Sequence, residues 1–480
     1  MNPVHASVEE VVALVRTRRA SAREVADAML DHLAQVNPAL NAVIDVDPQA
    51  VRDEADAVDR RLAQDPDALR LPGALFSVKD NLWVQGRRVG QGSRLFADFV
   101  APASALAVDR ARQAGGAVLG ISNCSEFACK GVTTNLVHGA TRNPWDLQRT
   151  PGGSSGGAAA AVAAGIGHFA LCTDGGGSTR RPAAHTGVVG FKPSAGAIAH
   201  PVGFAEPVFG NSVVGIMARR VADVATVFDA IAGPDRRDPL CVPGADSAPL
   251  RARVDRPAAG LRIAYSPRLG LDVPVDAEVL QAIERAARWL ADAGAEVIEA
   301  DPPWPAGTSE DALMPLQFAG LAALHGDAFR RDPAAFDPDI GVQIERGLGL
   351  GAADVARALF HRDAMYAALC GFFDGHDLLL SPTTPCVAWS IDQLGPRTIA
   401  GRSVAPRAHA VFTPAFNHLY APACSVPVGL DAQGLPIGAQ LAGWRGRDAE
   451  VLRAAAQLEA AAPQRFRSPV PMFTAGPEQA

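Results

Sequence analysis

Segments with a helical pattern alternate with short apolar segments along most of this chain. Two Ser-x-x-Glu capping boxes, Ser7–Glu10 and Ser21–Glu24, each open an amphipathic helix. Further helices are expected at 48–64, 104–115, 154–166 and 276–294, and short strands at 40–46, 73–84, 117–122, 168–174, 295–300 and 377–383. Alternation of this kind predicts an α/β fold with helices on the faces of a sheet.

The composition excludes several classes of protein. The 480 residues carry a net charge of −7 without a basic run, so direct binding of nucleic acid is not expected. The N-terminus lacks the pattern of a secretion signal, and the most apolar window, 156–172, is too rich in Ala and Gly to span a membrane. Seven cysteines without a Cys-x-x-Cys pair predict neither a disulfide framework nor a zinc site, which fits a cytoplasmic protein.

Lysine is rare in this chain. Of 44 basic residues only Lys79, Lys130 and Lys192 are lysines. Arginine does not deprotonate in proteins, whereas a buried lysine can, so these positions are candidates for a site that needs a neutral amine. Codon bias is the alternative explanation.

A glycine-rich loop follows the apolar segment 168–174. Glycines cost backbone entropy when they are ordered, so Gly175, Gly176 and Gly177 together indicate more than a connection. Side-chain-free residues allow several N–H groups to converge on the oxyanion that forms in acyl transfer. We therefore expect an oxyanion hole in these glycines, beside Ser178 as the nucleophile.

A serine nucleophile needs a base that takes its proton. The histidines nearest in sequence (His168, His185 and His200) have no recognisable carboxylate partner. Lys79, at the end of an apolar strand, is the stronger candidate.

A second serine-containing loop, "PGGSSGG", satisfies Gly-x-Ser-x-Gly with Ser154 at its centre. A nucleophile elbow of that form needs a buried strand before it, but the preceding segment 143–151 is polar and rich in turn residues. The loop also lacks the Lys-Ser/Thr ending of a phosphate-binding loop.

Three motifs, "FSVKDN", "PGGSSGG" and "TDGGGSTR" with "VVGFKPS" after it, stand in the order found in the amidase signature family. The chain resembles that family over nearly its whole length. The resemblance implies a triad with Ser178 as nucleophile, Ser154 as the bridging serine after a cis peptide bond, and Lys79 as base. It also assigns the oxyanion hole to Gly175, Gly176 and Gly177, together with the N–H of Ser178.

The family fold is a single large α/β domain with a mixed central sheet covered by helices. Applied to this chain, it spans 1–480, with an N-terminal helical segment at 1–65 and a catalytic core at 66–235. Residues 236–480 would supply the substrate pocket and the remaining part of the sheet, with pocket walls expected within 305–375.

Several residues near these motifs have less specific roles. Asp174 and Arg180 are expected to hold the loop in place, and Lys192 to support it. Lys130 is expected on the solvated surface. Phe127 and Cys124 are candidates for lining the pocket, with ordinary core packing as the alternative.

Arg181 departs from the family pattern, which has an uncharged residue at this place. If the chain turns helically after Ser178, positions 178 and 181 share a face. The guanidinium would then suit a carboxylate on the substrate. A salt bridge to one of the chain's own acidic residues is the alternative.

Together these features predict an amidase that hydrolyses a small-molecule amide through an acyl-enzyme, without a metal or a cofactor. Homodimers are common in the family, so the resemblance also allows a homodimer. A first alternative is the glutaminase subunit of a tRNA-dependent amidotransferase, although Arg181 stands where that subunit has glutamine. A second alternative is a non-catalytic scaffold protein. The presence of all three triad residues argues against it.

Overall fold

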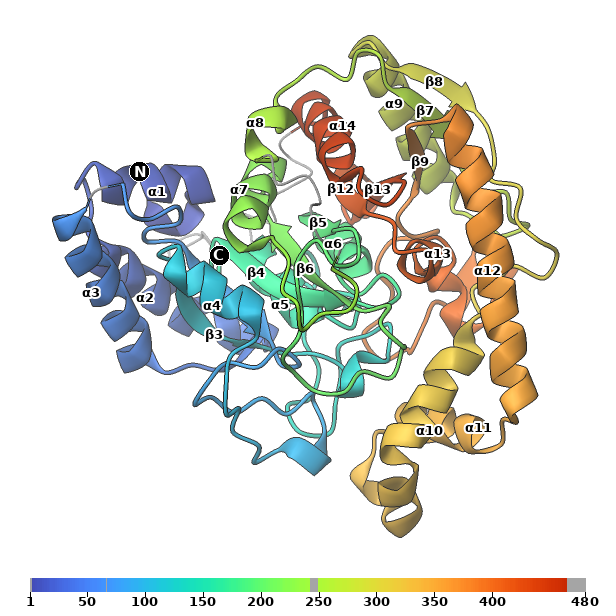
Figure 1. Ribbon diagram of the computed structural model, residues 1–480, viewed down its shortest axis with the longest axis horizontal. Coiled ribbons are helices and arrows are strands. Elements are labelled where there is room, and N and C mark those ends of the chain that lie inside the picture. Colours follow the sequence, from blue (N-terminus) through green and yellow to red (C-terminus); the bar gives the residue numbers. More distant parts are fainter. Residues whose placement is uncertain (1, 66, 242–248, 464–480) are drawn as a thin grey trace.

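An eleven-stranded mixed sheet organises the computed structural model, which describes residues 2–65, 67–241 and 249–463 (Figure 1). Its strands are β1 (Val43–Asp45), β2 (Leu75–Lys79), β3 (Ala117–Ser122), β4 (Phe169–Asp174), β5 (Val189–Lys192), β6 (Val213–Ala218), β7 (Arg262–Tyr265), β8 (Glu296–Glu299), β9 (Leu378–Pro382), β12 (Ala423–Leu430) and β13 (Pro436–Gly443). A separate hairpin consists of β10 (Thr398–Ile399) and β11 (Arg402–Ser403).

The strands lie in the order β1-β3-β2-β4-β6-β5-β12-β13-β9-β7-β8. β2 runs parallel to both β3 and β4, and β7 runs parallel to both β8 and β9. The remaining neighbours are antiparallel. Segments 1–65, 66–235 and 236–480 each contribute strands to this one sheet.

The α-helices of the described chain are α1 (Val8–Arg16), α2 (Ala22–Leu40), α3 (Pro48–Gln64), α4 (Leu106–Gln113), α5 (Gly156–Ala163), α6 (Arg180–Thr186), α7 (Val221–Ile231), α8 (Arg251–Val254), α9 (Ala277–Asp292), α10 (Met314–Arg331), α11 (Pro338–Leu348), α12 (Ala352–Gly375), α13 (Pro414–His418) and α14 (Asp448–Ala461). Short 3₁₀ turns lie at Pro3–His5, Arg94–Phe96, Glu126–Ala128, Pro333–Ala335 and Pro406–Ala410.

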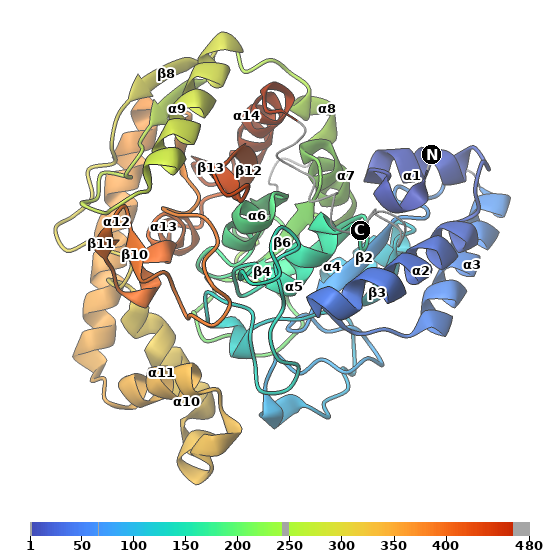
Figure 2. The same cartoon turned by 180° about the vertical axis from the view of Figure 1, so that it is seen from behind.

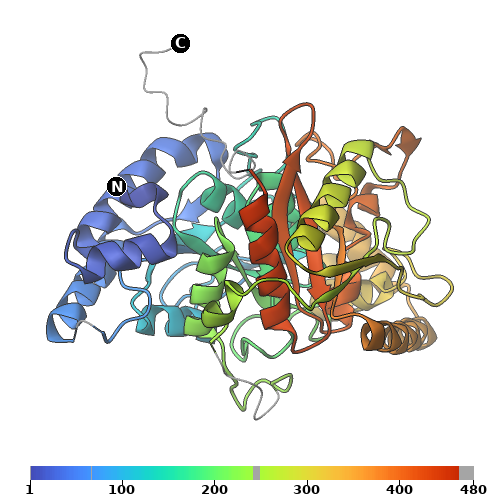
Figure 3. The same cartoon turned by 90° about the horizontal axis from the view of Figure 1, so that it is seen from above.

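Helices cover both faces of the sheet, which confirms the predicted fold class. α5 and α6 pack together on one face, and α7, α9 and α14 lie along the other, where α14 contacts both α7 and α9 (Figure 3). The central strands are buried along their whole length because each face is covered. No helix of the described residues is long and apolar enough to cross a membrane.

Helices outside these layers occupy opposite ends of the molecule. α1, α2 and α3 lie at one end, and α10, α11 and α12 at the other (Figures 1 and 2). Both expected capping boxes are present: Ser7 Oγ accepts from the Glu10 N–H at 3.1 Å and Ser21 Oγ from the Glu24 N–H at 3.0 Å.

Candidate active site

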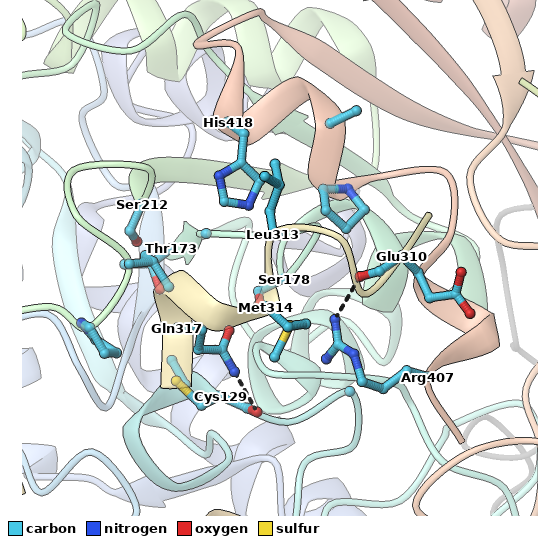
Figure 4. Close-up of a pocket in the computed structure, with 18 of the residues that line it drawn as sticks. Cys129, Thr173, Ser178, Ser212, Glu310, Leu313, Met314, Gln317, Arg407 and His418 are labelled. Atoms are coloured by element: carbon cyan, nitrogen blue, oxygen red, sulfur yellow. Dashed lines mark hydrogen bonds between the residues drawn. The ribbon is translucent and has the colours of Figure 1, made fainter. Parts of the chain in front are cut away.

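A cavity lies where β2 and β4 end. These strands are parallel neighbours, so their carboxyl ends meet at one edge of the sheet. The loops that follow them contribute Asn81, Gly175, Gly176 and Ser178 to the cavity wall. The side chains around the cavity in Figure 4 include those of Thr173, Ser178, Ser212, Leu313, Met314, Gln317, Arg407 and His418.

The far wall of the cavity comes from a distant part of the chain. Residues within the expected 305–375 contribute to this wall: Thr308, Leu313, Met314 and Gln317 just before and at the start of α10, and Met365 in α12. Gln317 donates to the carbonyl of Cys129, which ties α10 to the catalytic core (Figure 4).

Lys79 is fully buried at the end of β2. Its Nζ is 2.8 Å from Ser154 Oγ and donates to Thr173 Oγ1 at 2.9 Å. The peptide bond between Gly153 and Ser154 is cis. The structure thus brings Lys79 and Ser154 into direct contact, and Ser178 and Thr173 both line the cavity.

Thr173 and Asn81 were not among the residues expected at the site. Asn81 Nδ2 donates to Thr173 Oγ1 at 2.9 Å, so the threonine hydroxyl is held between an amide and the lysine amine. Both residues lie next to sequence motifs, Asn81 in "KDN" and Thr173 in "TDGGGS". That adjacency is the only sequence signal that could have identified them.

Burial lowers the pKa of Lys79, because the surrounding protein disfavours a charged amine. The carboxylate of Asp174, which favours the charged amine, is paired with Arg180 at 2.9 Å. Burial also raises the pKa values of three neighbouring thiols, which are therefore uncharged near neutral pH: those of Cys124, Cys129 and Cys172. Among the described residues no carboxylate forms an ion pair with Lys79, so loss of its proton breaks no such contact.

The glycine loop owes its shape to Gly177. This residue has φ +114, a region that side chains rarely adopt, and an added Cβ would lie 2.1 Å from Thr413 Oγ1. Its N–H donates to Asp174 Oδ1 at 2.6 Å and so points away from a ligand. By contrast, the N–H groups of Gly175, Gly176 and Ser178 have no hydrogen-bond partner among the described residues outside the strand ladders, and all three residues line the cavity.

Asp174 and Arg180 form a fully buried ion pair directly beside this loop. Asp174 accepts from the N–H groups of Gly177 and Thr179. Burial alone would raise the pKa of Asp174, but the Arg180 guanidinium outweighs it and holds the pKa well below its usual range. Arg180 also donates to Gln440 Oε1 at 2.8 Å, which fastens the loop to β13.

We expect Arg180→Met to destabilise the protein by about 3–5 kcal/mol, because it leaves the Asp174 carboxylate buried without its counter-charge. The shift of the urea midpoint measures this loss. Arg237→Met provides the control, since the Arg237 side chain is 57% exposed where it pairs with Asp235 and its loss should leave the midpoint nearly unchanged. Equal midpoints for both variants would contradict the anchoring role of Arg180.

The two expected pocket residues of the "SEFA" segment have different surroundings. Phe127 lines the cavity, and its ring stacks on His325 with 4.0 Å between centroids. Cys124 is fully buried and is not among the described residues that line the cavity.

The expectation that Lys130 is a solvated surface residue was wrong. Its side chain is 3% exposed, and Nζ lies 2.5 Å from Asp337 Oδ2. It also donates to Thr134 Oγ1 at 3.0 Å. The partner carboxylate caps α11, more than 200 residues away in sequence, so no local pattern indicates this contact.

The three histidines considered as bases lie in surroundings that lower their pKa values. The His168 ring accepts from the Leu75 N–H, and burial lowers its pKa to about 4. Burial lowers the pKa of His185 to about 3. His200 lines the cavity, and burial also lowers its pKa. The described residues contain no group of His, Cys, Asp and Glu that could hold a metal ion.

Comparison with known proteins gives consistent matches along the chain. The Amidase family model matches residues 24–452. An acylamidase of Rhodococcus erythropolis is 36% identical over 468 residues, which cover 96% of this chain and 97% of the relative. One subunit of the glutamyl-tRNA(Gln) amidotransferase of Symbiobacterium thermophilum is 34% identical, covering 91% of this chain and 92% of the relative.

A solved structure agrees with these matches. A bacterial aryl acylamidase of the amidase signature family superposes with a TM-score of 0.89 at 30% identity, covering 97% of this chain and 99% of that chain. The family match, the relatives and the fold confirm what the motifs led us to expect: the chain belongs to the amidase family of amidase signature enzymes.

Proposed function

We propose that the chain hydrolyses the amide bond of a small-molecule substrate through an acyl-enzyme on Ser178. The 2.8 Å contact between Lys79 and Ser154 carries this proposal, because it couples a buried amine to a serine hydroxyl. The same amine donates to Thr173, which lines the cavity. The acylamidase and aryl acylamidase relatives support the same class of reaction.

In the proposed mechanism Ser178 Oγ attacks the amide carbonyl carbon. Its proton passes to Ser154, whose own proton passes to neutral Lys79. The N–H groups of Gly175, Gly176 and Ser178, which have no partner among the described residues outside the strand ladders, donate to the oxyanion. The N–H of Gly177 donates to Asp174 and is not part of this set. The proton returns to the nitrogen of the leaving amine as the C–N bond breaks, and water then releases the acid and restores Ser178.

A panel of amides tests this function on the purified chain alone. We expect release of acid and of amine or ammonia in equal amounts, measured separately, and undiminished rates after treatment with strong chelators. Failure to hydrolyse any amide in the panel, or loss of activity on chelation, would contradict the proposal.

The similarity to the amidotransferase favours a second candidate function, in which the chain releases ammonia from glutamine within a complex. Arg181 stands where the family resemblance places glutamine in the glutaminase subunit, which argues against this function. Hydrolysis of other amides by the chain alone would separate the two functions.

From composition and family resemblance we further propose a cytoplasmic homodimer, and gel filtration tests the dimer.

A further inference from the structure

Arg181 is a buried cation without an ionic partner in the part of the chain that the structure describes. The residue is 7% exposed, its Nε is buried without a hydrogen bond, and no described carboxylate forms an ion pair with it. The salt bridge considered as an alternative is therefore not what the structure shows for the described residues. Burying an unpaired charge is costly, so a side chain in this state is expected where a ligand brings the counter-charge.

The guanidinium lies against the proposed oxyanion loop. A Cβ built at Gly177 would be 3.1 Å from Arg181 Nε, and both Arg181 and Ser178 line the cavity. Asp174, a carboxylate whose charge acts on Arg181, already binds Arg180 through both carboxylate oxygens. Arg181 therefore has no described counter-ion where it lines the cavity together with Ser178.

A second guanidinium, that of Arg407, lines the same cavity (Figure 4). Arg407 is partly exposed and binds Asp311 at 2.9 Å through Nε, and its Nη2 donates to the carbonyl of Glu310. Burial lowers the pKa of Arg181 to about 9, and the positive charge of Arg407 contributes. Both guanidinium groups thus line the cavity that Ser178 also lines.

Arg407 has its counter-ion in Asp311, but the acidic residues that line the cavity do not neutralise Arg181. Glu206 accepts from the Gly210 N–H, and burial raises its pKa to about 7, so its carboxyl is partly uncharged at neutral pH. Glu310 contacts Arg407 through its backbone carbonyl rather than its carboxylate. An anionic ligand group therefore meets an excess of positive charge at Arg181.

We propose that the substrate carries a carboxylate, held by Arg181 and supported by Arg407, close to the scissile amide. This inference rests on the proposed function and narrows its substrate class to monoamides of small dicarboxylic acids. A planar guanidinium can bind such a carboxylate with two parallel hydrogen bonds, which fixes the orientation of the neighbouring amide.

Binding can be measured without turnover in the Ser178→Ala variant. We would titrate malonamate, succinamate and glutaramate, each against its neutral diamide, by calorimetry. At least one monoamide should bind about ten times more tightly than its diamide, the scale of one charged hydrogen-bonding contact, and adding Arg181→Met should remove that preference. Arg181→Lys keeps the positive charge but loses the planar guanidinium, so it should retain part of the preference for the monoamide.

Kinetics of the enzyme with Ser178 intact give a second measurement. Arg181→Met should lower the ratio of kcat/KM for monoamide over diamide by about tenfold to a hundredfold, mainly through KM. Arg149 is not among the described residues that line this cavity, so Arg149→Met is the matched control and should leave the ratio unchanged.

The outcomes separate this inference from the proposed function. No preference for any monoamide, or equal losses on both substrates in Arg181→Met, overturns the carboxylate site even if amides are hydrolysed. A preference that depends on Arg181 in a chain that hydrolyses nothing supports the site and overturns the proposed function. If Arg181→Met does not fold, Arg181→Lys and the comparison of ligands in Ser178→Ala still decide.

Discussion

Ser178→Ala should abolish labelling by a fluorophosphonate probe and lower amide turnover by at least about 10⁴-fold. The probe forms a covalent bond only with an activated hydroxyl, so it reports the nucleophile independently of the substrate. Alanine removes that oxygen while leaving the backbone N–H groups that we assign to the oxyanion. Mass spectrometry of the labelled peptide, together with the amide assay, measures both effects.

The neighbouring serines provide the controls. Ser155→Ala removes a fully buried hydroxyl that contacts the backbone of Thr173 rather than Lys79, and it should keep the labelling. Label found on Ser154, with Ser178→Ala still active, would contradict our assignment and favour the Gly-x-Ser-x-Gly loop as a nucleophile elbow.

The core of the candidate site could be predicted because its parts are short, continuous pieces of sequence. Lys79 ends one apolar strand, and the glycine loop before Ser178 follows another. Parallel pairing of β2 and β4 then brings the two ends together. The alternation of helical and apolar segments likewise predicted the layered fold.

The rarity of lysine identified buried positions but not their roles. All three lysines are buried, as a requirement for an unusual amine would suggest. Lys79 contacts Ser154, Lys130 forms an ion pair with Asp337, and Lys192 donates to a backbone carbonyl. Composition cannot distinguish these three environments, because each depends on which residues the fold places next to the lysine.

Contacts between distant segments had no comparable signal. Arg407 and the start of α10 reach the cavity from parts of the chain that carry no motif. An ion pair or a single wall residue leaves no periodic pattern, so the far wall could be predicted only as the broad range 305–375. The engaged N–H of Gly177 also escaped prediction, since it depends on the exact turn of the loop.

Lys79→Arg should be as damaging as Lys79→Ala, with turnover lowered about 10²–10⁴-fold, the usual contribution of a general base. A guanidinium preserves the positive charge but cannot accept the proton from Ser154. Lys192→Arg is the matched control: Lys192 is also fully buried, and burial lowers its pKa to about 7, but it donates to a backbone carbonyl instead of a serine. Its activity should follow the folded fraction measured by circular dichroism.

The pH dependence gives an independent reading of the same lysine. The neutral amine is the active form, so activity should rise with pH through one ionisation and then level off. Because burial lowers the pKa of Lys79, the rise should lie below the pH at which an exposed lysine loses its proton. In Lys79→Ala the remaining activity should no longer rise with pH through this ionisation, rather than show the same rise at a lower rate. Substantial activity in Lys79→Arg with an unchanged profile would mean that Lys79 supplies charge alone, and another base would then have to serve Ser178.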